Sequence, residues 1–274
     1  MKKFTGLAMF ALVTSFFCVA CDSDKEGTLA ITIWGESYIE NEIPPATDAE
    51  DGFEDGYKLA YSKFLVVIRD ISVEGALNVS ESKVWNVHLA APSDRGTQIL
   101  SVTAPANDYD HTAYTIAPAN SATVAGNAST DDTAFMLDNG YSVYVEGTAT
   151  APGKDKKTFA WGFKNSTRFD PCESKGTLKD GGEEFIQITI HGDHLFYDSA
   201  ISQDAALRFA EVASADKDDD GKITVDELKD LTLDTLAHHD VGSFPIKNMW
   251  EYISLMVTTI GHIDGEEECK ITPL

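Results

Sequence analysis

Positive charge is scarce in this sequence. Its 274 residues include 21 Lys and Arg against 45 Asp and Glu, which gives a formal net charge of −24 at pH 7. A surface of that sign repels the phosphates of nucleic acids and of anionic lipids, and it concentrates cations. We therefore expect no nucleic-acid partner, and cations become the first ligands to consider.

Motifs of common enzymes are also missing. The sequence contains no G-x-S-x-G, no H-E-x-x-H and no glycine-rich phosphate loop. Acidic residues are plentiful, but no spacing marks two of them as the carboxylate pair of a glycosidase. We therefore expect a binding protein and not an enzyme.

Long apolar runs are absent, and the apolar run at the N-terminus is short. Lys2 and Lys3 precede Gly6–Phe17, which has the length of a signal-peptide core and is too short to span a membrane. Residues 1–20 are therefore predicted to be a signal peptide that exports the protein.

The end of this run resembles a bacterial lipoprotein signal. Cys18-Val19-Ala20-Cys21 is similar to the lipobox, with Cys18 where that family has Leu. The resemblance implies that Cys21 carries lipid, that residues 21–27 form a tether, and that the protein is anchored to a bacterial membrane, at its periplasmic face or the cell surface. The alternative is a plain secretory signal cleaved near Ala20.

Cysteine is rare, with four residues in the chain. If Cys18 leaves with the signal and Cys21 is lipidated, Cys172 and Cys269 remain. An isolated pair in an oxidising compartment is expected to form a disulfide. The alternative is two free thiols.

The sequence contains many short segments in which apolar and polar residues alternate. Segments of this kind, bounded by Gly, Pro, Asn or Asp, are typical of half-buried strands. An antiparallel β-sandwich over residues 28–195 would bury them. The expected strands lie at 27–34, 57–73, 83–90, 98–104, 112–117, 141–149, 157–163 and 184–190.

The periodicity changes near residue 195. Helical spacing of apolar residues predicts helices over 203–215, 225–237 and 246–260. The fold class is therefore expected to be α+β, with the sandwich followed by a helical domain over 196–274.

The most specific motif is Asp216–Glu227, DKDDDGKITVDE, whose D-x-D-x-D-G-x5-E spacing is that of an EF-hand calcium loop. Calcium takes six to eight oxygen ligands, and Gly221 permits the sharp turn between them. The alternative is a solvated acidic loop without an ion. The predicted ligands are Asp216, Asp218, Asp220, Lys222 through its carbonyl, Thr224 through water, and Glu227.

The C-terminus repeats part of this motif. Lys270-Ile271-Thr272 matches Lys222-Ile223-Thr224, and Ile271 at the same loop position would put acidic residues at the preceding ligand positions. We therefore expect a truncated second hand that pairs with the first and binds calcium poorly, because it lacks the turn glycine and the last Glu. The alternative is a frayed terminus.

His191 and His194 form a second candidate site, with Asp193 between them. They would reach one zinc or copper ion only if Gly192 makes a turn, because residues i and i+3 of an extended chain point to opposite faces. The His pair and Trp161-Gly162-Phe163, expected on a neighbouring strand, resemble MbnP-type copper-binding β-sandwich proteins. The alternative is a pair that hydrogen-bonds the sandwich to the helical unit.

As a whole, the sequence resembles uncharacterised bacterial lipoproteins with a C-terminal EF-hand. The resemblance implies an exported, lipid-anchored protein that binds Ca²⁺, and with one complete loop we expect the ion to be structural. Two alternatives stay open: a transition-metal protein that uses His191 and His194, and a surface adhesion or carbohydrate-binding module.

Overall fold

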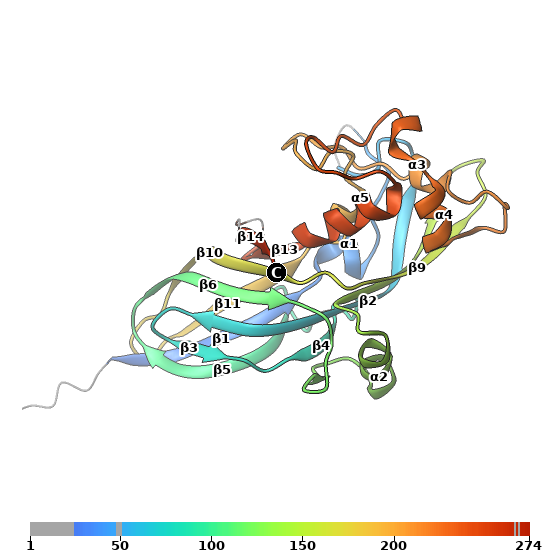
Figure 1. Ribbon diagram of the computed structural model, residues 1–274. Coiled ribbons are helices and arrows are strands. Elements are labelled where there is room, and N and C mark those ends of the chain that lie inside the picture. Colours follow the sequence, from blue (N-terminus) through green and yellow to red (C-terminus); the bar gives the residue numbers. More distant parts are fainter. Residues whose placement is uncertain (1–24, 48–50, 266, 268) are drawn as a thin grey trace, which may run out of the picture.

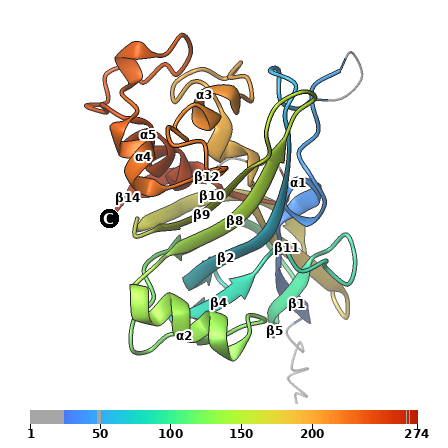
Figure 2. The ribbon, with the colours of Figure 1, turned by 90° about the vertical axis from the view of Figure 1, so that its right-hand side faces the viewer.

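The computed structural model describes residues 25–47, 51–265, 267 and 269–274. These residues form a mostly β structure with two sheets arranged as a sandwich and a few short helices (Figures 1 and 2). The predicted signal peptide and Cys21 lie outside the described residues.

The smaller sheet has four strands in the order β13-β11-β1-β5. Strand β1 pairs in parallel with β11, and the other two pairs are antiparallel. The predicted antiparallel sandwich is therefore wrong at this pair, because the long connection between β1 and β11 returns the chain in the same direction. The strands are β1 (Glu26–Trp34), β5 (Thr97–Pro105), β11 (Glu183–Ile190) and β13 (Gly261–Ile263).

The larger sheet has ten strands, seven of them in the order β12-β9-β8-β2-β6-β10-β14. Its remaining strands, β3, β4 and β7, attach through β2 and β4. Its members are β2 (Lys58–Val73), β3 (Leu77–Val79), β4 (Lys83–Asn86), β6 (Asp108–Ile116), β7 (Val124–Ala125), β8 (Val143–Thr150), β9 (Lys157–Phe163), β10 (Thr167–Thr177), β12 (Lys222–Ile223) and β14 (Cys269–Pro273).

Strand β2 is buried on both faces. Phe64 and Val66 belong to the main core between the sheets, while Leu65 and Val67 pack under helix α2 (Thr130–Asn139) on the outer face. This double burial accounts for the continuous apolar run in a strand. Sequence analysis missed α2, although Ser129 caps its start and Gly140 ends it in the left-handed conformation.

The other helices are short, and no EF-hand helical unit is evident in the described part of the chain. The helices expected over 203–215, 225–237 and 246–260 shrink to α3 (Ala210–Ala213), α4 (Val225–Asp230) and α5 (Met249–Met256). Figure 2 shows them gathered beside β8 and β9, with α2 on the other side. The remaining helices are α1 (Glu36–Glu40) and the 3₁₀ turns η1 (Asp193–Phe196), η2 (Leu233–Thr235) and η3 (Val257–Thr259).

Tertiary hydrogen bonds explain the short helices. Leu207 forms β-bridges with Phe53 and Tyr197, so the segment before α3 is extended. After α4, Thr232 bridges Asn248 and the chain pairs with the residues leading into α5. These backbone contacts outweigh the helical spacing of the apolar residues.

The truncated second hand is also wrong. Ile271 lies in β14 and pairs with Phe169 of β10, while Ile223 pairs with Phe159 of β9. The two segments therefore never meet, because each finds a partner in the larger sheet.

The disulfide between Cys172 and Cys269 is confirmed. It joins β10 to β14, two strands that pair in the larger sheet. One apolar core runs from the sandwich to the C-terminal helices, and the division into domains at residue 195 stays a prediction.

Among the described residues, no helix combines the length and the apolar character needed to cross a bilayer.

Candidate metal centres

The acidic loop 216–227 connects α3 to α4 and is fixed to the edge of the larger sheet. Its residues Lys222 and Ile223 form β12, which pairs in parallel with β9. Ile223 is buried, and its carbonyl accepts a hydrogen bond of 2.9 Å from Trp161 Nε1. The buried Ile223 side chain and the backbone pairing of β12 with β9 thus hold the loop in place.

Three of the predicted ligands converge. One carboxylate oxygen each of Asp216, Asp218 and Asp220 lies within 4.8 Å of the others. Asp218 and Asp220 are exposed, whereas the Asp216 side chain has no exposed surface. Asp216 Oδ2 accepts hydrogen bonds from Gly221 N at 3.0 Å and from Lys157 Nζ at 2.6 Å, and its Oδ1 has no hydrogen-bond partner.

The other predicted ligands serve the loop in other ways. Glu227 Oε2 accepts from Thr224 N and Oγ1 in a capping box that starts α4, and its Oε1 accepts from Lys217 N. Lys222 contacts Asp220 through both its backbone N–H and its ammonium group. Gly221 has φ +81°, a backbone conformation that a side chain would strain.

Lys157 is a feature that the sequence did not predict. Lys157 belongs to β9, the strand with which β12 pairs, and its side chain is 12% exposed. Its hydrogen bond to Asp216 raises the pKa of Lys157, and the same bond lowers the pKa of Asp216. A tethered cation therefore neutralises part of the charge that a bound ion would neutralise.

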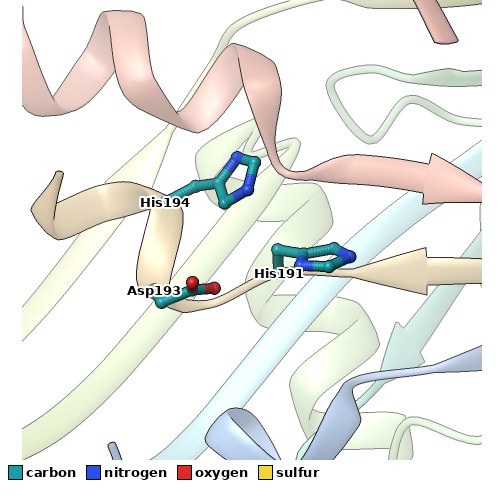
Figure 3. A group of neighbouring side chains, drawn as sticks. All are labelled: His191, Asp193 and His194. Carbon is teal, nitrogen blue, oxygen red and sulfur yellow. The ribbon is translucent and has the colours of Figure 1, made fainter. Parts of the chain in front are cut away.

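The second candidate centre lies at the end of the smaller sheet. His191 follows β11 directly, and Gly192 starts the 3₁₀ turn η1, which carries Asp193 and His194 (Figure 3). The turn that a shared ion requires is thus present. The ring centroids of His191 and His194 are 5.1 Å apart, and the two residues form with Asp193 a group whose ligand atoms lie within 4.8 Å of one another.

Hydrogen bonds orient these side chains. His191 Nδ1 lies 3.4 Å from Glu36 Oε2, and His194 Nδ1 lies 3.0 Å from Thr259 Oγ1. Tyr197 O–H donates to Asp193 Oδ2 at 2.9 Å, whereas the buried Asp193 Oδ1 has no hydrogen-bond partner. Metal-bound histidines in proteins commonly have such carboxylate or hydroxyl partners on the other ring nitrogen. The second ring nitrogen of His191, Nε2, lies 3.2 Å from the Gly265 carbonyl, and an ion at this nitrogen would displace that contact.

A third imidazole, His262 of β13, joins the pair. Its ring centroid is 4.4 Å from that of His191 and 5.1 Å from that of His194. Sequence analysis missed it because it lies 71 residues after His191 and no local motif surrounds it. The two meet because Thr189 of β11, two residues before His191, pairs with His262 in the β11–β13 ladder, and such a pairing leaves no signal in the sequence.

The histidine environment favours neutral rings. Burial, and then the neighbouring imidazoles, lower the pKa values of His194 and His262 to about 3. Burial and the Asp193 carboxylate raise the pKa of Tyr61, whose hydroxyl donates to Gly192 O at 2.6 Å. Neutral imidazole is the form that binds metals.

Trp161 is not on a strand next to β11, although its ring centroid lies 6.5 Å from that of Phe196 in η1, the turn that carries His194. Its strand β9 belongs to the larger sheet, whereas β11 belongs to the smaller one, so the expected neighbouring strand is not found. Trp161 instead donates a hydrogen bond to the acidic loop.

No protein-family model, curated protein or solved structure matches the chain.

Proposed function

We propose that this chain is an exported metal-binding protein whose principal ion is calcium, bound with a structural role in the acidic loop 216–227. The observation that carries this proposal is Asp216 Oδ1, a buried carboxylate oxygen without a hydrogen-bond partner in a group of three converging carboxylates. Burying such an oxygen costs free energy unless an ion or a donor satisfies it. The D-x-D-x-D-G-x5-E spacing names calcium as the ion.

Glu227 would have to change partners on binding. Its two oxygens now accept from Lys217 N and from Thr224, and calcium would exchange these bonds for bidentate coordination. Extracellular calcium modules bind with dissociation constants of about 10⁻⁴–10⁻³ M, where external calcium keeps a site filled. A bound ion would then fix α3, β12 and α4 against the sandwich.

Calorimetric titration with Ca²⁺ tests this proposal. Glu227→Gln keeps an oxygen that can accept the capping hydrogen bonds but loses the charge, so we expect affinity to fall about 100-fold, or about 2.8 kcal/mol. Asp226→Asn is the matched control, because Asp226 lies in the same loop, is 91% exposed and occupies no ligand position. Equal affinity of wild type and Glu227→Gln would rule out the calcium site.

A transition-metal site at His191, Asp193 and His194 is a second candidate. It is favoured by the buried Asp193 Oδ1, which lacks a hydrogen-bond partner beside two imidazoles. Imidazole and carboxylate together suit zinc or copper. Metal analysis of protein purified without chelator should find such an ion in wild type and not in His191→Ala, while calcium binding is retained.

We further infer export with a lipid anchor at Cys21, in a protein that resembles lipoproteins with an EF-hand motif and acts by binding and not by catalysis. The Cys172–Cys269 disulfide supports a compartment outside the cytoplasm. Mass spectrometry of the mature protein tests the anchor: a diacylated or triacylated Cys21 is expected, and an unmodified N-terminus near residue 21 would contradict it.

A further inference from the structure

We propose that His262 is a third nitrogen ligand of the ion held by His191 and His194, and that the Cys172–Cys269 disulfide fixes the segment that carries it. This inference rests on the transition-metal site proposed above and extends it from two histidines to three. The ligand class is a divalent first-row transition ion bound by three imidazoles and one carboxylate.

The spacing of the rings fits one shared ion. A zinc–nitrogen bond of about 2.0–2.1 Å puts each ring centroid about 3.2 Å from the ion, so two imidazoles at the tetrahedral angle have centroids about 5.2 Å apart. The three measured separations are 5.1, 5.1 and 4.4 Å. The two separations that involve His194 match this value, and the separation between His191 and His262 is shorter. Because packed rings also have centroids about 4.5–7 Å apart, the spacing permits a shared ion, and the buried atoms without hydrogen bonds carry the argument.

Two buried atoms of the cluster lack the partners that a structural role would supply. His262 Nδ1 and Asp193 Oδ1 are both buried without a hydrogen bond. They belong to different elements, β13 and η1, and the His262 ring contacts the rings of His191 and His194. His262 is not a member of the group whose ligand atoms lie within 4.8 Å of one another, so its ring would move toward an ion that binds there. An ion between them would satisfy both atoms at once.

The position of His262 depends on close packing around β13. A side chain at Gly261 would lie 2.5 Å from Tyr114 Oη and 2.7 Å from Phe169, so only glycine lets the strand approach this closely. Tyr114 O–H donates to the carbonyl of His262 at 3.0 Å. The backbone of His262 is thus held by a residue of the larger sheet, while its ring contacts the rings of His191 and His194.

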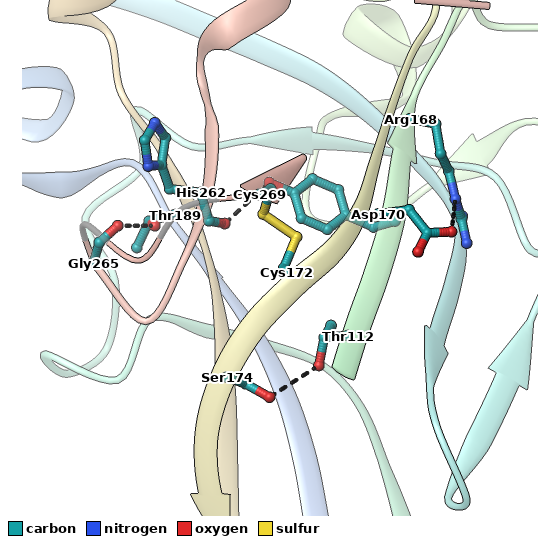
Figure 4. Close-up of a disulfide and its surroundings, with 10 residues drawn as sticks. Thr112, Arg168, Asp170, Cys172, Ser174, Thr189, His262, Gly265 and Cys269 are labelled. Carbon is teal, nitrogen blue, oxygen red and sulfur yellow. Dashed lines mark hydrogen bonds and ion pairs between the residues drawn. A yellow bond between two sulfur atoms is a disulfide. The ribbon is translucent and has the colours of Figure 1, made fainter. Parts of the chain in front are cut away.

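The disulfide holds the next part of the segment. Cys269 follows His262 by seven residues and is bonded to Cys172 of β10, as Figure 4 shows. Between them, the carbonyl of Gly265 accepts hydrogen bonds from Thr189 Oγ1 at 2.8 Å and lies 3.2 Å from His191 Nε2. The C-terminal segment therefore contacts the histidine cluster at two points, through the His262 ring and through the Gly265 carbonyl beside His191.

A surface hollow borders the cluster. His194, Tyr197, Met256 and Thr259 are among the residues that line this hollow of about 510 Å³. Of the cluster, His194 is the member in this lining, so the cluster is nearest to solvent at His194.

Electron paramagnetic resonance of Cu²⁺ added to the calcium-loaded protein tests the proposal directly. Coupling to three imidazole nitrogens is expected in wild type, and to two in His262→Gln and His262→Ala. Zn²⁺ calorimetry on the same variants should show about a 100-fold loss of affinity. His111→Ala is the matched control, because His111 is about half exposed and outside the cluster.

Each outcome decides a different point. Wild-type nitrogen count and affinity in His262→Gln, with binding lost in His191→Ala, would overturn the role of His262 and leave the two-histidine site standing. No binding of either ion by wild type would overturn both. A variant that still binds calcium is taken to be folded. If neither His262 variant folds, the wild-type spectrum alone decides: coupling to two nitrogens instead of three would overturn the proposal.

Discussion

The acidic loop 216–227 presents carboxylates at the edge of the larger sheet, whereas the histidine cluster lies at the end of the smaller one, with His191 3% exposed. The loop draws all its candidate ligands from twelve consecutive residues. The cluster draws its own from a strand end, a 3₁₀ turn and a strand 71 residues further along the chain. Hard oxygen donors in a contiguous loop suit calcium, and convergent imidazoles suit zinc or copper. The two regions should therefore respond independently to mutation.

The largest expected effect comes from removing the disulfide. Cys172→Ser with Cys269→Ser opens a loop of 97 residues and should lower the free energy of unfolding by about 4 kcal/mol, measured by urea denaturation. Zinc affinity should fall with it, because the segment with His262 is released, while calcium affinity should stay unchanged. Equal losses of both affinities would show that the two regions depend on the same strands.

Next in size is a crossed pair of single substitutions. Asp216→Asn should lower calcium affinity about 100-fold, or about 2.8 kcal/mol, and leave zinc affinity unchanged. His191→Ala should do the reverse. Calorimetry of both variants with both ions measures all four values, and a variant that weakens both ions would break the proposed independence.

The acidic loop and the histidine cluster also differ in how much of each could be predicted from the sequence. The convergence of Asp216, Asp218 and Asp220 could be predicted because their spacing is local, and most strands could be predicted because alternation is local too. His262 and the extended segment around Leu207 could not be predicted, since each is fixed by backbone pairing with residues distant in the sequence. Strand β10 was missed because Pro171 and Gly176 interrupt its pattern, and β-bulges in the structure accommodate both.

A smaller effect is expected at Lys157, which compensates Asp216 within the protein. Lys157→Gln should raise calcium affinity about 10-fold, or about 1.4 kcal/mol, because a competing cation is gone. The ion-free protein should become less stable, since Asp216 loses its buried partner. Lys229→Gln is the control, because Lys229 is half exposed and pairs with Asp226. Unchanged calcium affinity in Lys157→Gln would mean that the Lys157 ammonium group does not compete with the ion for Asp216.

The smallest effect is expected at Glu211, which accepts hydrogen bonds from His238, His239 and Ala237 N. Burial acts to raise the pKa of Glu211, but these hydrogen bonds lower it below the ordinary value overall. Because the folded-state pKa is lowered, its stabilisation is present above the unfolded pKa of about 4.3 and is lost as pH falls through the folded value.

We therefore expect Glu211→Gln to cost about 1 kcal/mol at about pH 7 and nearly nothing at about pH 3, measured by urea denaturation. Neither ion affinity should change by more than about twofold, because Glu211 belongs to neither ligand group. A stability difference independent of pH would show that Glu211 acts through packing and not through its charge.

The two-residue strand β12 has a consequence for how this protein avoids other copies of itself. Without β12, strand β9 would be the last strand at this edge of the larger sheet, with unpaired N–H and C=O groups able to recruit a strand from another molecule. Lys222 and Ile223 cover part of that edge, and their loop carries enough negative charge to repel a second chain. We expect that deleting the loop would promote edge-to-edge association, so the same twelve residues would also protect the protein from polymerisation.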